Sequence, residues 1–94
     1  MAFRVDFTDA ARREFLDLPM AVRARVARLI QLLAVDPRCP GTRQLAGHPG
    51  LRRAHAGKDY VVVYTIRQEA VLILIVRVGH RRDVYRRLPK LMDG

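Results

Sequence analysis

Apolar and polar side chains recur along this chain at the periods of strands and helices. The segment Phe3–Phe7 alternates apolar and charged residues, a pattern typical of a half-buried strand. Thr8 or Asp9 can cap a helix that follows immediately and runs to about Leu18. The first twenty residues therefore predict a strand and then a short helix.

A second, longer helix is predicted to begin at Pro19 and to end at Asp36-Pro37. Proline suits the first turn of a helix because its missing N–H would have no partner there, and the residue before a proline disfavours helix. Apolar side chains recur at steps of three and four, at Val22, Val26, Leu29, Ile30 and Leu33. We expect the two helices to form a hairpin that packs on a sheet.

The segment between Asp36 and Gly50 contains three prolines and three glycines and is predicted to be a loop. It is long for so small a domain, and loops of this length are usually functional or mobile. Gln44–Ala46 is compatible with a short turn that places Leu45 against the core.

Three strands are predicted in the second half of the chain, at Leu51–Ala56, Tyr60–Ile66 and Val71–Val78, with turns at 57–58 and 68–69. The last strand is apolar on both faces except at Arg77, so we expect it inside the sheet with cover on each side. Short turns between consecutive strands favour an antiparallel meander.

A short C-terminal helix is expected from Asp83 to Leu91, because Asp83 suits a helix N-terminus. The order of elements is strand, helix, helix, three strands and a short helix, with no internal repeat. The sequence therefore predicts one α+β domain over residues 1–94, with the helices on one face of an antiparallel sheet.

The net charge of +9 gives information about the binding partner rather than about the fold. Residues 51–94 carry ten basic and four acidic side chains, whereas residues 1–50 carry eight and five, and sixteen of the eighteen basic residues are arginine. Arginine suits phosphate binding, so the charge favours a polyanionic partner, either nucleic acid or an acidic protein. A genome rich in arginine codons, with charges spread for solubility, is the alternative.

No segment of the sequence resembles a secretory signal or a membrane span. Cys39 is the single cysteine, which excludes an internal disulfide and fits a reducing compartment. We therefore expect a cytoplasmic protein without membrane association.

Familiar catalytic patterns are absent from the sequence. It has no glycine-rich phosphate loop, no Cys/His/Asp arrangement and no close pair of carboxylates. Its three histidines are scattered, so neither a metal site nor another cofactor is expected.

A basic and aromatic cluster remains, at the end of the last predicted strand. It contains His80, Arg81, Arg82 and Tyr85, and the basic residues upstream are Arg52, Arg53, His55 and Lys58. Such groups suit metal-free RNA cleavage, in which a 2′-hydroxyl attacks the neighbouring phosphate while positioned groups move protons and cations neutralise charge. The alternative is an ordinary surface, on which Tyr85 covers the sheet and arginines face water. We expect that second role for Arg86 and Arg87.

Nearly the whole chain resembles toxins of the RelE/ParE superfamily, from bacterial type II toxin–antitoxin modules. The resemblance is carried, in the family's order, by Phe-Thr-Asp-Ala-Ala-Arg-Arg-Glu at 7–14, Leu-Pro at 18–19, Asp-Pro-Arg at 36–38, Arg-Arg-Ala-His-Ala-Gly-Lys-Asp-Tyr-Val-Val-Val-Tyr at 52–64 and Val-Gly-His-Arg-Arg-Asp-Val-Tyr-Arg-Arg at 78–87. The last segment is similar to the RelE branch.

The resemblance implies a toxin that cuts messenger RNA at the ribosomal A site and is bound by an acidic antitoxin. Operator DNA would be contacted only through that antitoxin. Arg81 would match a catalytic arginine and Tyr85 the tyrosine that activates the 2′-hydroxyl. Arg52, Arg53 and His55 would lie on the basic strand that grips RNA.

Val61 departs from the family pattern, because an arginine aimed at the cleaved phosphate usually follows Asp-Tyr. Lys58, His55 or Arg53 would then supply the charge, or cleavage would be weak. Two alternatives stay open: a ParE-like inhibitor of DNA gyrase, and a degenerate toxin that only binds its antitoxin.

Overall fold

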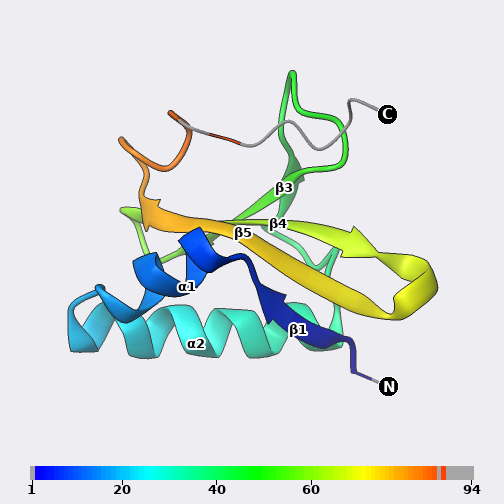
Figure 1. Ribbon diagram of the computed structural model, residues 1–94, viewed down its shortest axis with the longest axis horizontal. Helices are drawn as coiled ribbons and strands as arrows, with labels where there is room; N and C mark the ends of the chain where they lie inside the picture. Colours follow the sequence, from blue (N-terminus) through cyan, green and yellow to red (C-terminus); the bar gives the residue numbers. More distant parts are fainter. Residues whose placement is uncertain (1, 87, 89–94) are drawn as a thin grey trace.

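Two helices pack on one face of a five-stranded sheet in the computed structural model, which describes residues 2–86 and 88 (Figure 1). The elements are β1 (Arg4–Phe7), α1 (Asp9–Leu16), α2 (Met20–Val35), β2 (Arg43–Gln44), β3 (Arg52–Ala56), β4 (Tyr60–Arg67), the short 3-10 helix η1 (Gln68–Ala70) and β5 (Leu72–His80). The predicted α+β class and the two-helix hairpin on a sheet are confirmed.

The sheet is mixed rather than purely antiparallel, so that part of the prediction is wrong. Its strand order is β1-β5-β4-β3-β2, and β1 runs parallel to β5 while every other pair is antiparallel. The chain leaves β1, passes through both helices and the meander, and returns beside β1 in the same direction. Apolar alternation reports which face a side chain takes and contains no information on strand direction.

Two further expectations need correction. Arg43 and Gln44, expected in a loop, form the edge strand β2 by pairing with Arg53 and Arg52 of β3. Residues 81–86 form consecutive turns, so the helix expected from Asp83 is not present over its first four residues. Residues 87 and 89–91 of that expected helix lie outside the described residues.

The central strand β4 is buried on both of its faces. On the helix side, Val62 and Tyr64 join a core with the α2 side chains Val26, Ile30 and Leu33. On the opposite side, Val61 and Val63 join a second cluster of fully buried residues, completed by Leu51, Val76 and Val84. The 45–51 loop and the 81–86 turns cover this second face (Figure 1).

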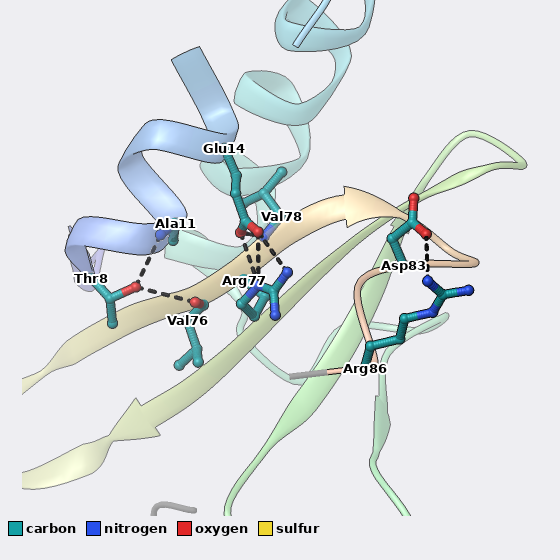
Figure 2. Close-up of polar contacts among 8 residues, drawn as sticks. All are labelled: Thr8, Ala11, Glu14, Val76, Arg77, Val78, Asp83 and Arg86. Atoms are coloured by element: carbon teal, nitrogen blue, oxygen red, sulfur yellow. Dashed lines mark hydrogen bonds and ion pairs between the residues drawn. The ribbon is translucent and has the colours of Figure 1, made fainter. Parts of the chain in front are cut away.

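Helix α1 is fixed to β5 by two polar side chains (Figure 2). Thr8 caps the helix by accepting from the N–H of Ala11 at 3.1 Å, and its hydroxyl donates to the carbonyl of Val76 at 3.1 Å. Glu14 accepts from the N–H of Val78 at 3.0 Å and pairs with the guanidinium of Arg77 at 2.7 Å. Beyond the end of β1, the carboxylate of Glu14 thus provides the hydrogen-bond acceptor for a backbone N–H at the open edge of β5.

Over residues 2–86 and 88, neither helix has the length and apolar character that crossing a membrane requires.

Replacing Glu14 by alanine should destabilise the fold, because the Val78 N–H and the half-buried Arg77 guanidinium both lose their carboxylate. We expect the free energy of unfolding to fall by about 2–3 kcal/mol, measured by urea denaturation. Glu69→Ala, at an exposed residue of η1, is the control and should change it by less than about 0.5 kcal/mol. Equal effects of the two substitutions would contradict the role of Glu14.

Candidate functional site

Val84 determines where the chain after β5 lies. Its side chain is fully buried against Val61, Val63 and Val76 on the sheet face opposite the helices. Because Val84 is fixed there, the neighbouring Tyr85 is held half-buried at the margin of the same cluster. Packing therefore positions one of the two residues expected to be catalytic.

Strand β3 presents Arg53 and His55 on this same face. They pair across the strands with Val63 and Val61, and residues paired in this way share a face of the sheet. Nη1 of Arg53 lies 2.7 Å from Nε2 of His55. A guanidinium only donates, so Arg53 is the donor in this contact and Nε2 of His55 is the acceptor.

Arg53 and Tyr85 line one open groove of about 610 Å³. The 45–51 loop forms another wall of this groove through Leu45, Ala46 and His48. Arg43 of the edge strand adds a second cation. The groove thus combines cationic, aromatic and apolar side chains on the face away from the helices.

Arg81 lies where β5 ends, beside the turn that joins β3 to β4. Its backbone N–H donates to the carbonyl of Asp59 at 2.7 Å, and its Nε is 3.7 Å from Oδ1 of the same residue. Both side chains are about half exposed. An exposed pair at this distance contributes only about 0–1 kcal/mol, so Arg81 can leave Asp59 for an incoming anion.

Arg52 and His80 do not share the face of Arg53 and Tyr85. Arg52 pairs across the strands with Tyr64 of the helix-side core, and its Nη2 donates to the Thr42 hydroxyl at 2.7 Å. His80 pairs with Tyr60, and the two rings meet edge to face at 5.6 Å. Successive side chains of a strand point to opposite faces of the sheet. Arg52 and His80 therefore do not belong to the group formed by Arg53 and Tyr85, although they are close to these residues in sequence.

Lys58, Arg82 and Arg86 are exposed. Lys58 belongs to the turn between β3 and β4, and the backbone N–H of Arg82 donates to Nδ1 of His80 at 3.2 Å. Arg86 forms a long surface pair with Asp83 at 3.9 Å (Figure 2). Its exposure agrees with the expected surface role, whereas Arg87 lies outside the described residues.

Val61 is fully buried at the centre of the second cluster, beneath the chain that carries Val84. A charged side chain at this position would have to displace that cover to reach an anion. Arg53 and His55 lie on the neighbouring strand, and His55 is the direct cross-strand partner of Val61. Of the three residues considered as substitutes, these two share the face of Tyr85, and Lys58 lies in the turn.

Within the described part of the chain, no three His, Cys, Asp or Glu side chains are close enough together to hold a metal ion.

Sequence reasoning missed His48, Arg43 and Asp59. The first two were assigned to an irregular loop, and no period of apolar residues marks them. The useful signal was the pair Leu45 and Leu51, because two apolar residues in a polar loop indicate that it folds back on the core. The contact of Asp59 with Arg81 could not be predicted, because it depends on the β3–β4 turn lying beside the end of β5.

Comparisons with known proteins agree on one superfamily. Residues 5–85 match the family model described as the ParE toxin of the type II toxin–antitoxin system, parDE. Toxin RelG of Mycobacterium tuberculosis is 36% identical over 91 residues, which cover 93% of this chain and 100% of that protein.

Solved structures give the same result. The RelBE2 toxin–antitoxin complex of M. tuberculosis matches with a TM-score of 0.76 and 29% identity, over 86% of this chain and 100% of the matched chain. The intact RelBE toxin–antitoxin complex of Escherichia coli matches with a TM-score of 0.75 and 25% identity, over 84% and 96%. The two-helix, mixed-sheet fold and the sequence match together place this chain in the ParE toxin family, within the RelE/ParE superfamily of type II toxin–antitoxin systems.

Proposed function

We propose that this toxin cleaves messenger RNA on the ribosome and so inhibits translation in the cytoplasm. The observation that carries the proposal is the groove lined by both Arg53 and Tyr85, with His55 in contact with Arg53. The similarity to proteins named RelG and RelE supports the same reading. The products would be a 2′,3′-cyclic phosphate and a free 5′-hydroxyl.

Three tasks have to be performed in this reaction. Tyr85 activates the 2′-hydroxyl that attacks the adjacent phosphate, Arg53 neutralises charge on the pentacoordinate phosphorus, and Arg81 stabilises or protonates the departing 5′-oxygen. Each positioned proton-transfer group contributes about 10²–10⁴-fold, and fixed cationic donors contribute a comparable factor. All three tasks use side chains of this chain alone.

Arg53 and His55 take the place of the arginine that the family usually carries at position 61. They lie on the strand beside Val61 and face the same way, so the charge of Arg53 reaches the same surface from a different element. Lys58 is exposed in the adjacent turn and would contact RNA backbone further out. Arg82, also exposed, would do the same from the segment after β5.

An acidic antitoxin is the expected protein partner. The net charge of +9 favours an acidic binding protein, and the similar structures from M. tuberculosis and E. coli are toxin–antitoxin complexes. Operator DNA would be reached only through that antitoxin.

Arg81→Ala and Tyr85→Phe should each relieve the growth arrest that follows induction of the toxin. Each change removes one positioned group, so we expect cleavage to fall by about 10²–10⁴-fold. Colony counts after induction measure the effect, and circular dichroism of each purified variant verifies that it is folded. Undiminished toxicity of both folded variants would refute the assignment.

Arg53→Ala should lower cleavage at least about tenfold, whereas Arg52→Ala should lower it far less. The two residues are adjacent on β3 but lie on opposite faces, so the pair forms a matched control. Initial rates on translating ribosomes, at equal concentrations of folded protein, measure the difference. Equal losses of cleavage rate in the two variants would show that the position of an arginine on one or the other sheet face does not affect cleavage.

The ParE family model favours one other function, inhibition of DNA gyrase by direct binding. That activity needs no catalytic set. It predicts induction of the DNA-damage response, co-purification of gyrase and full toxicity of Tyr85→Phe, with messenger RNA left intact.

A further inference from the structure

We propose that the groove between the 45–51 loop and Tyr85 holds a nucleobase next to the cleaved phosphate, and that His48 sets the base preference. This inference rests on the proposed cleavage of RNA and names the part of the substrate that the groove takes. It also gives a function to a loop that is long for so small a domain.

The loop is held in place by its own backbone and by the second core. The N–H of Leu45 donates to the carbonyl of Leu51 at 2.9 Å, and the N–H of His48 donates to the carbonyl of Leu45 at 3.2 Å. Leu51, 1% exposed, anchors the loop in the cluster around Val61. His48 therefore projects from a framework that is formed before any ligand arrives, which limits the entropy lost on binding.

The size and lining of the groove suit a flat aromatic ring. Tyr85 and His48 supply ring surfaces, and Leu45 and Ala46 supply apolar wall. Its volume of about 610 Å³ lies within the usual range for small-molecule sites. Splayed single-stranded bases are commonly stacked on tyrosine or histidine and hydrogen-bonded along their edges, and an imidazole can do both.

The charges in the groove indicate a nucleotide rather than a peptide. Arg43 and Arg53 both line it, so a phosphate attached to the bound base would meet a guanidinium. An acidic peptide segment without aromatic residues would satisfy the cations but would leave the rings of His48 and Tyr85 without a matching flat partner. Because Arg53, which is proposed to bind the reacting phosphate, also lines the groove, the bound base and that phosphate would be neighbours on one strand of RNA.

Titration of the purified chain with the four 5′-ribonucleoside monophosphates, followed by NMR, tests the inference directly. Ribose 5-phosphate is the control ligand, since it has the phosphate and sugar but no base. We expect at least one nucleotide to shift the His48 ring and Leu45 methyl signals and to bind at least about fivefold more tightly than ribose 5-phosphate. Equal affinity of ribose 5-phosphate, or shifts by an amphipathic acidic peptide and by no nucleotide, would overturn it.

His48→Ala separates a base-reading role from a structural one. We expect its affinity for ribose 5-phosphate to stay within about twofold of wild type, while the preference among nucleotides falls at least about fivefold. The variant should also lose preference among messenger RNAs that differ by one base at the cut site. Arg67→Ala, at an exposed cation at the far end of β4, should change neither property.

The outcomes distinguish the two proposals. Cleavage by His48→Ala with unaltered base preference would overturn the groove assignment and leave the proposed function intact. If the chain binds nucleotides base-selectively but cuts no RNA, the assignment of the groove as a base site is supported and the proposed cleavage of RNA is contradicted.

Discussion

The burial of strand β4 on both faces is the constraint on which the rest of this structure depends. The helices bury Val62 and Tyr64 on one face, and the burial of Val61 and Val63 requires a second cover on the opposite face. Among the described residues, the 45–51 loop and the segment after β5 supply that second cover. The 45–51 loop and the 81–86 turns are therefore part of the core as much as part of the surface.

The second cover also explains how so small a domain can position reactive groups. Three half-buried side chains of the site lie close in sequence to a buried anchor: Tyr85 follows Val84, Arg53 precedes Ala54, and His48 lies three residues before Leu51. The buried anchors limit how far these side chains can move. Arg81 differs, since its surface pair with Asp59 is weak enough to be exchanged for a phosphate.

Much of the fold could be predicted from the sequence, because apolar periodicity is a strong signal. Val22, Val26, Leu29, Ile30 and Leu33 predicted the buried stripe of α2, and the run before Gly79 predicted an inner strand. The parallel pairing of β1 and the short strand β2 could not be predicted in this way. Strand direction leaves no trace in the alternation of side chains, and a strand of two polar residues has no apolar pattern.

The candidate site could be predicted only as a set of residue types. Adjacent numbers suggested that Arg52 and Arg53, or His80 and Arg81, act together, yet alternation along each strand sends Arg52 and His80 to the helix side. The groove residues Arg43 and His48 come from a segment with no regular pattern. Side-chain chemistry is local in sequence, whereas the assembly of a site depends on contacts between distant segments.

Mapping of messenger RNA 5′-ends after induction of the toxin is the most direct test of the central claim, that this sheet face cuts translated RNA. The account predicts new 5′-hydroxyl ends in phase with codons, which disappear when initiation of translation is blocked. Arrested growth with intact messenger RNA, or cuts that persist on untranslated RNA, would contradict it.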